Sequence, residues 1–211
     1  MKKLKFYKGN LYESGFNGKR VLVIGHQKKN DDDPQKNIYK DECIKCRHCE
    51  NVVGPCYSDN DNVSLMENLV EHAPWIDTHD GDSYRRFARM FTRNDSLSTD
   101  SEGWKDFWSK IAFFNYIQRH AVNKTGYDDP QEYEKMLGIC LEHIEDLQPD
   151  VVMCWGNKVY ERIEGVAQCK QQNTCVLKLQ SGKDVIVIRF HHPSQGFSYP
   201  DSRKLLEEVG L

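Results

Sequence analysis

Residues 20–25 decide the fold and read Arg-Val-Leu-Val-Ile-Gly, four consecutive aliphatic side chains closed by a glycine. A short continuous apolar run of this kind is typical of a strand that is buried on both faces, as in a parallel sheet. Residues 150–155, Asp-Val-Val-Met-Cys-Trp, repeat the pattern, and residues 174–180 and 184–190 form a strand-like pair around Ser-Gly-Lys. We therefore expect a sheet whose central strands are fully buried, with a hairpin near its end.

Amphipathic segments alternate with these strands. Apolar side chains spaced three and four apart predict one helix over residues 82–93 and another over 131–147, which Pro149 ends. Shorter helices are expected around 104–108, over 157–164 with Asn157 as the N-cap, and over 201–209. Buried strands that alternate with amphipathic helices indicate the α/β class, a three-layer α/β/α sandwich with a mostly parallel central sheet.

Length and composition set the remaining limits. The chain has 211 residues, which predicts a single domain over 1–211 with a polar, cysteine-rich insertion at about residues 28–62. The net charge of −3 gives no global attraction to nucleic acid, so such binding would need a local basic patch. The chain begins without the apolar stretch of a secretory signal, has no membrane-length run and contains eight cysteines. We expect a soluble, cytoplasmic protein that does not bind a membrane.

In parallel sheets, ligands bind outside the carboxyl ends of the strands, so the residues directly after each strand are the candidates for function. Gly25, His26 and Gln27 follow the first strand, and Asn115 follows the apolar run 111–114. The later strands are followed by Trp-Gly at 155–156 and by His-His-Pro-Ser at 191–194. From the residues alone, Asn115 is as consistent with capping a helix or closing a turn as with binding a ligand.

With these four groups in this order, the chain resembles the uracil-DNA glycosylase superfamily. Members of that superfamily carry a polar motif after the first strand, an asparagine after the second, Trp-Gly after the third and His-Pro-Ser after the last. The resemblance extends from about residue 18 to residue 199 through short motifs. It is closest to an uncharacterised bacterial branch in which a cysteine-bearing insertion follows the first strand. The expected fold is therefore uracil-DNA glycosylase-like.

The resemblance implies base excision from DNA, that is, hydrolysis of the N-glycosidic bond of uracil or a related damaged base. The partner would be DNA, single-stranded or uracil-containing, with the target base flipped out of the stack. Asn115 would read the edge of the base, and His192 would donate a hydrogen bond to a base oxygen as negative charge develops there. The residues expected to bind substrate or enter the duplex are Gly25, His26, Ser194, Phe197 and Tyr199.

The chain also departs from the family pattern. The best-studied members place Asp or Asn just after the first-strand glycine to position the attacking water, whereas this chain has His26 and Gln27. Gln27 would orient a water but is a poor base. Phe91 is the candidate for the aromatic residue that stacks on the base. The alternative is a catalytically inactive or repurposed member that binds a nucleobase, a nucleotide or single-stranded nucleic acid.

The sharpest local motif is a cysteine cluster in the insertion. Cys43, Cys46, Cys49 and Cys56 lie within fourteen residues at spacings that suit four thiolate ligands of one tetrahedral Zn2+. The same spacing is compatible with a 4Fe–4S cluster, and His48 is an alternative fourth ligand for zinc. If the cluster were the recognition surface, the chain would instead be a metal-stapled interaction protein.

Arg85, Arg89 and Arg93 recur every four residues on the polar side of the 82–93 helix. Such a row is typical of a solvated helix face. It is also the local basic patch that an acidic chain would need to follow DNA phosphates. Both interpretations remain open from the sequence.

Overall fold

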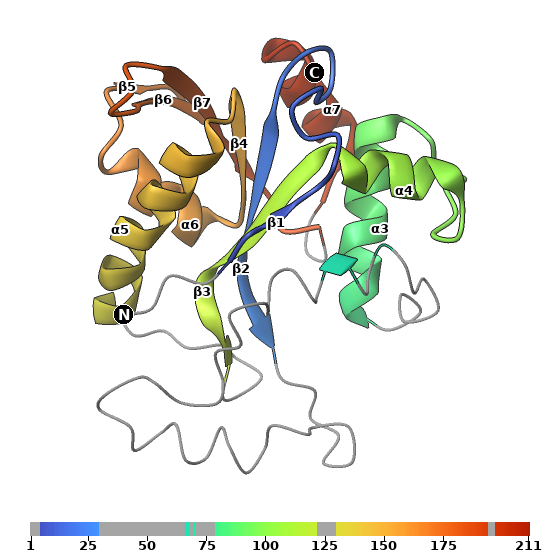
Figure 1. The fold of residues 1–211 in the computed structure, drawn as a ribbon, viewed down its shortest axis with the longest axis horizontal. Coiled ribbons are helices and arrows are strands. Elements are labelled where there is room, and N and C mark those ends of the chain that lie inside the picture. Colours follow the sequence, from blue (N-terminus) through green and yellow to red (C-terminus); the bar gives the residue numbers. More distant parts are fainter. Residues whose placement is uncertain (1–4, 30–65, 68–69, 71–78, 122–129, 194–196) are drawn as a thin grey trace.

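The computed structural model describes residues 5–29, 66–67, 70, 79–121, 130–193 and 197–211. Within them the chain forms a seven-stranded sheet in the order β1-β3-β2-β4-β7-β6-β5 (Figure 1). The strands are β1 (Tyr7–Lys8), β2 (Val21–Lys29), β3 (Ile111–Ala121), β4 (Val151–Trp155), β5 (Cys169–Lys170), β6 (Thr174–Lys178) and β7 (Asp184–Phe190).

The centre of the sheet is parallel. Strands β3, β2, β4 and β7 run in the same direction, whereas β1, β6 and β5 pair antiparallel at the two margins. Val21 pairs with Ile111 on one side and with Val151 on the other, and Val151 pairs with Ile186. All five residues of β4 are buried, as expected for the middle of a sheet covered on both faces.

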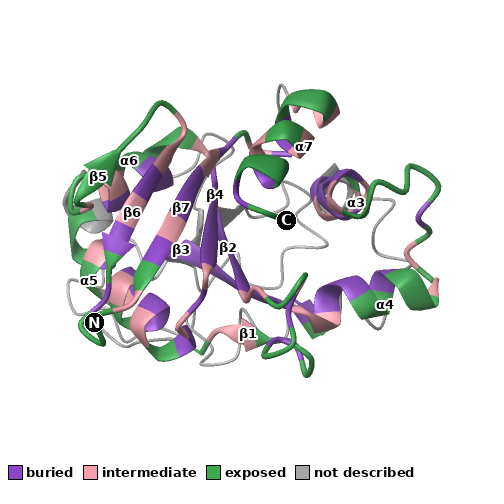
Figure 2. Cartoon of the chain, turned by 90° about the horizontal axis from the view of Figure 1, so that it is seen from above, coloured by how far each residue is buried: buried purple, intermediate pink, exposed green. Residues whose placement is uncertain are grey.

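Helices cover both faces of this sheet (Figures 1 and 2). On one face, α5 (Pro130–Leu147) and α6 (Asn157–Glu164) contribute to a core with Leu22, Ile24 and Val152. On the other face, α3 (His79–Thr92), α4 (Glu102–Ser109) and α7 (Tyr199–Glu208) enclose Val21, Val23 and Met153. The expected α/β class and its layered arrangement around a mostly parallel sheet are confirmed.

Several boundaries differ from those expected. Strand β2 continues to Lys29, so Lys28 and Lys29 belong to the strand and not to the insertion, most of which lies outside the described residues. Strand β3 continues past Asn115 to Ala121. The two short marginal strands β1 and β5 were not predicted, because a pair of residues carries no periodicity.

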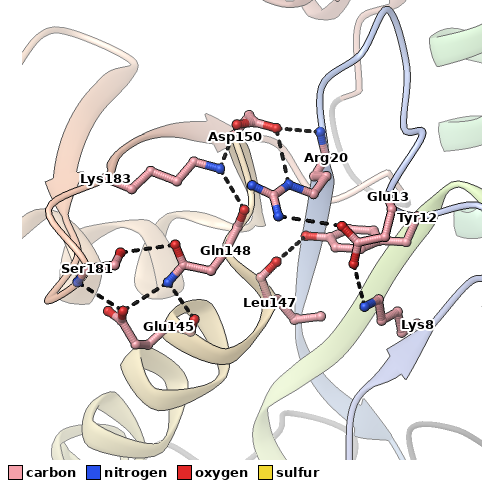
Figure 3. Close-up of polar contacts among 10 residues, drawn as sticks. All are labelled: Lys8, Tyr12, Glu13, Arg20, Glu145, Leu147, Gln148, Asp150, Ser181 and Lys183. Atoms are coloured by element: carbon pink, nitrogen blue, oxygen red, sulfur yellow. Dashed lines mark hydrogen bonds and ion pairs between the residues drawn. The ribbon is translucent and has the colours of Figure 1, made fainter.

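The starting ends of the central strands are held by Asp150 (Figure 3). One carboxylate oxygen accepts the backbone N–H of Arg20 at 2.7 Å, and the other accepts from Lys183 Nζ at 2.6 Å. The backbone amides of Asp150 and Val151 both donate to the Arg20 carbonyl, and Ile186 donates to the Asp150 carbonyl. One residue therefore ties β2, β4 and the β6–β7 hairpin together.

The same contacts affect the ionisation of Asp150. Partial burial disfavours the charged form, but the hydrogen bonds from Lys183 and the Arg20 amide, with the charges of both residues, outweigh it and lower the pKa. A carboxylate with a lowered folded pKa stabilises the fold above its unfolded pKa of about 3.9, and this contribution is lost as the pH falls through the folded pKa.

We expect Asp150→Asn to lower the free energy of unfolding at pH 7 by about 1.5–3 kcal/mol, the usual value of hydrogen bonds to a charged group. Urea denaturation of both proteins at pH 7 and below pH 4 measures this, and the difference should shrink at the acid end. Asp106→Asn is the matched control, because the Asp106 carboxylate forms an exposed pair with Lys110 at 2.8 Å. Its effect should be within about 0.5 kcal/mol. Equal effects of the two substitutions would contradict the role of Asp150.

Candidate functional site at the carboxyl ends of the strands

Three of the candidate residues, Gly25, Asn115 and Trp155, lie in one row across the sheet together with Phe190. Gly25 pairs with Asn115, and Trp155 pairs with Phe190. The two pairs are joined because Ile24, the residue before Gly25, pairs with Cys154, the residue before Trp155. The parallel register therefore brings Gly25 and Asn115 to the same level as Trp155 and Phe190, the last residues of β4 and β7.

The row lies where the connections between strands switch from one face of the sheet to the other. From β2 the chain proceeds through α3 and α4, on one face of the sheet, to β3. From β4 it proceeds through α6, on the opposite face, towards β7. Connections that leave adjacent strands on opposite faces leave a crevice between them, which is where parallel α/β sheets bind ligands.

Gly25 makes room for Asn115. A Cβ atom at position 25 would lie 2.4 Å from Asn115 Oδ1 and 3.0 Å from Phe113 Cζ. Both distances are shorter than van der Waals contact, so only glycine allows the amide and the ring to occupy their positions. Asn115 is a buried polar residue with 8% of its surface exposed, in the row just described. This placement does not resemble a capping or turn role, since Asn115 lies inside β3.

An aromatic cluster surrounds the end of β4. The ring of Trp155 lies 5.3 Å from Tyr84, 5.0 Å from Phe87 and 5.8 Å from Phe113, measured between ring centroids. The His192 ring meets Trp155 edge to face at 5.9 Å. Trp155 is 2% exposed, and within the described part of the chain its indole N–H meets no acceptor. The sequence-based assignment of Trp155 to the core is confirmed, and this core residue also contacts His192.

The turn after β4 requires a glycine for a conformational reason. Gly156 has a φ of 111°, which side-chain-bearing residues rarely adopt, and its N–H donates to the Phe190 carbonyl at 2.8 Å. Gly156 occupies the N-cap position of α6, so the prediction of Asn157 as the cap was wrong. Asn157 Oδ1 instead accepts from Arg189 Nε at 2.8 Å, which links α6 to β7.

Other residues of the expected site are only partly defined. His26 follows Gly25 in β2 and is half-buried. The backbone of Gln27 pairs with Ile117, and its side chain lies outside the described part of the chain. Ser194 and the four insertion cysteines, Cys43, Cys46, Cys49 and Cys56, also lie outside the described residues.

Phe91 does not join the strand-end row. Its ring packs against Phe16 at 4.6 Å and Phe107 at 5.3 Å, in the core between α3 and α4. Tyr84, almost two turns earlier on α3, contacts Trp155 and Phe113 instead. Sequence reasoning placed Tyr84 on the same apolar stripe but did not consider it for the site. The stripe shows which face is buried, but not which turn of the helix lies over the strand ends.

Two of the three α3 arginines that were expected to contact DNA phosphates form contacts within the protein. Arg89 Nε donates to the Leu97 carbonyl at 3.0 Å, and Arg93 forms an ion pair with Glu207 of α7 at 2.6 Å. Arg93 also has a φ of 56° directly after the last residue of α3. Arg85 is half-buried on the same helix. These contacts favour a structural role for the row over phosphate tracking.

Phe197 and Tyr199 pack at the beginning of α7. Phe197 lies 5.8 Å from Phe190 and 5.7 Å from Tyr199, and the Arg203 guanidinium lies over the Tyr199 ring at 5.4 Å. Burial raises the pKa of the Tyr199 hydroxyl. Both side chains are half-buried, so a role as a wedge would require them to leave these contacts.

The described residues contain no group of three or more His, Cys, Asp or Glu side chains arranged to hold a metal. Cys140 and Cys154 are buried core residues as expected, and burial raises the pKa of both thiols. No helix in the described ranges is both long enough and apolar enough to cross a membrane.

Comparison of the chain with protein-family models and with curated protein sequences gives no match. The candidate site is therefore defined by its geometry: a buried amide, a glycine that makes room for it, and a histidine on an aromatic cluster.

We expect Gly25→Ala to displace Asn115 and to lower the free energy of unfolding by about 1–3 kcal/mol, because the new methyl group overpacks the strand end. Chemical denaturation measures the stability, and the NMR signals of the Asn115 side-chain amide report its displacement. Gly138→Ala is the control, since a Cβ at this position in α5 meets nothing within 4 Å. It should stabilise the helix by about 0.5–1 kcal/mol. An unshifted Asn115 amide in Gly25→Ala would refute the proposed steric relation.

Proposed function

We propose that this chain is a base-excision glycosylase of the uracil-DNA glycosylase type, which hydrolyses the N-glycosidic bond of uracil or a related damaged base in DNA. The observation that carries the proposal is the row Gly25, Asn115 and Trp155, with His192 in contact with Trp155. Residues from four separate sequence motifs lie together at the level where β4 and β7 end.

The side chains suit recognition of a nucleobase. The Asn115 amide offers two N–H donors and one carbonyl acceptor, which matches the carbonyl and imino groups on the edge of a pyrimidine. The indole N–H of Trp155 is a further buried donor at the same strand ends. The neighbouring Tyr84 and Phe113 rings supply aromatic surface beside these polar groups. A flipped base needs this combination of edge recognition and aromatic contact.

The reaction breaks the bond between the base nitrogen and the anomeric carbon of the sugar, and the bonding electron pair leaves with the base. A hydrogen bond from His192 to a base oxygen would stabilise the negative charge that develops there. Water adds its hydroxyl group to the anomeric carbon, and its proton balances the departing base. The imidazole of His192, which contacts Trp155 of the row, can donate such a bond.

The attacking water also needs a group that orients it and accepts its proton, and we assign this role to Asp80 from its position in α3. Asp80 lies four residues before Tyr84 and seven before Phe87, so these three positions share one face of α3. Tyr84 and Phe87 are the α3 residues that contact Trp155. Helical geometry therefore places position 80 one turn from the aromatic cluster, towards the beginning of the helix.

For the first test, metal-replete protein is incubated with oligonucleotides that contain uracil, hypoxanthine or a G·T mismatch, both single- and double-stranded, and abasic sites are cut with alkali. We expect His192→Ala to lower the cleavage rate by about 10²–10³-fold, the usual effect of removing a donor to a developing oxyanion. His191→Ala is the matched control, because His191 is the exposed neighbour, and it should retain the parent rate.

Cleavage that survives His192→Ala would refute the assignment of this histidine. If folded parent protein cuts none of the substrates, the alternative takes precedence, namely a protein that keeps the nucleobase site without catalysis. The departure at His26 and Gln27 from the family's Asp or Asn is the observation that favours this alternative.

The carboxylate is tested separately. Asp80→Asn should lower the cleavage rate by about 10²–10⁴-fold, the range for removal of a general base, with little change in substrate affinity. Asp82→Asn is the matched control, since position 82 lies on the opposite side of α3 from Phe87. Both rates are measured under single-turnover conditions. Equal rates for the two variants would exclude Asp80 as the group that activates water.

We also propose that Cys43, Cys46, Cys49 and Cys56 bind Zn2+ with their four thiolates, with a 4Fe–4S cluster as the alternative. The local spacing supports this part of the proposal. The metal would organise the insertion, whereas the base site consists of residues from the sheet and α3.

A further inference from the structure

The sheet has an uncovered face at its β5 margin. The core on the side of α3, α4 and α7 reaches Ile186, Ile188 and Phe190 of β7, and among the described residues it includes none from β5 or β6. The core on the other side does include β6, through Cys175 and Leu177. Figure 1 shows α3, α4 and α7 to the right of β4, and β5 and β6 to its left. Within the described part of the chain, helices therefore cover β5 and β6 on one face only.

The strand register identifies the side chains on the other face. Val176 pairs with Cys169 of β5 on one side and with Ile186 of β7 on the other, and Ile186 pairs with Val151 of β4. Residues paired in this way point to the same face of the sheet. Val151 is fully buried, Ile186 and Val176 are half-buried, and Cys169 is exposed. The row thus passes from the core to solvent without leaving the sheet.

A lysine and an aspartate lie side by side at one end of this apolar row. Lys178 pairs with Asp184, two residues along the strands from Val176 and Ile186, so both charges are on the same face as the row. Both residues are exposed, and no ion pair or side-chain hydrogen bond joins either of them to another described residue. We call Cys169, Val176, Lys178, Asp184 and Ile186 the uncovered face.

The charges of the uncovered face make it complementary to itself. In a two-fold symmetric pair, Lys178 of each copy can meet Asp184 of the other, because the same patch is used on both sides. The row of Cys169, Val176 and Ile186 would then pack against its own copy. Free cysteine is among the most often buried residue types, so an exposed thiol beside two aliphatic side chains also fits a surface that becomes covered.

We propose that the uncovered face is the interface of a two-fold symmetric homodimer, in which the outer strands of one copy pack face to face on those of a second copy. The face is small for a protein interface, so the dimer is weak and forms at micromolar concentrations. The inference does not rest on the proposed function, because the row of the candidate site includes no residue of β5 or β6.

The first test is sedimentation equilibrium of the full-length protein from about 5 to 500 µM, a range suited to a weak interface. Val176→Lys places a charge in the apolar row and should weaken dimerisation at least about tenfold. Leu11→Lys is the matched control, because Leu11 is 43% exposed and follows β1, at the opposite margin of the sheet. It should stay within about twofold of the parent. Unchanged melting temperatures show that the variants are folded.

Charge reversal tests the symmetry of the pairing and uses only exposed positions. Lys178→Glu and Asp184→Lys should each weaken dimerisation about fivefold or more, because each creates two like-charge contacts across the two-fold axis. The double variant restores both pairs and should return to within about twofold of the parent. Because these side chains are exposed, this test holds even if Val176→Lys does not fold.

Cys169 reports on the same surface by its reactivity. Its alkylation by iodoacetamide, followed by peptide mass spectrometry, should be fast in dilute protein and at least about threefold slower where dimers predominate. A parent protein that is monomeric at every concentration would overturn the proposal. Dimerisation that survives Val176→Lys and both charge reversals, or an equal loss in Leu11→Lys, would also overturn it. Slow alkylation in dilute, monomeric protein would show that another segment of the same chain covers this face, which contradicts the dimer.

Discussion

Asp150 ties together the starting ends of β2, β4 and β7, and with them the register of these three parallel strands. Because it accepts from the Arg20 amide and from Lys183, the beginnings of β2, β4 and the β6–β7 hairpin are fixed relative to one another. In a parallel ladder, a register set at one end is kept at the other, so Gly25, Trp155 and Phe190 reach the opposite edge together. The contacts of Asp150 at the starting ends of the strands thereby determine which residues lie at the same level near their opposite ends.

At the level where β4 and β7 end, the sheet contains a buried polar side chain, that of Asn115. Asn115 lies at the same level of the sheet as the aromatic residues Trp155 and Phe190, and the space for its amide comes from the missing side chain at Gly25. The glycine at position 25 and the buried amide at position 115 fit each other sterically, which is why we interpret this pair as functional.

The sequence predicts much of the fold because apolar runs such as 21–24 and 151–155 can be satisfied only inside a covered sheet. It also predicts that Gly25, Asn115, Trp155 and His192 belong to one edge, since chain order and parallel direction suffice for that. The sequence does not predict contacts that depend on how the helices pack on the sheet. Phe91 and Tyr84 lie on the same apolar stripe of α3, and only the placement of α3 determines which of them contacts Trp155. The length of β2 beyond Gly25 was missed for a related reason, because polar residues such as Lys28 carry no strand pattern of their own.

The continuation of β2 and β3 past the other strands has a consequence for the energetics of opening. Up to Ile24, each amide of β2 lies in a sheet with neighbours on both sides, and exchanges with solvent only when that core opens. Beyond Gly25, the two strands are paired in the described region only with each other, and a two-stranded ribbon is marginal on its own. The part of β3 beyond the buried residues Tyr116 and Ile117 should therefore exchange faster than the part before Asn115, although both belong to one strand.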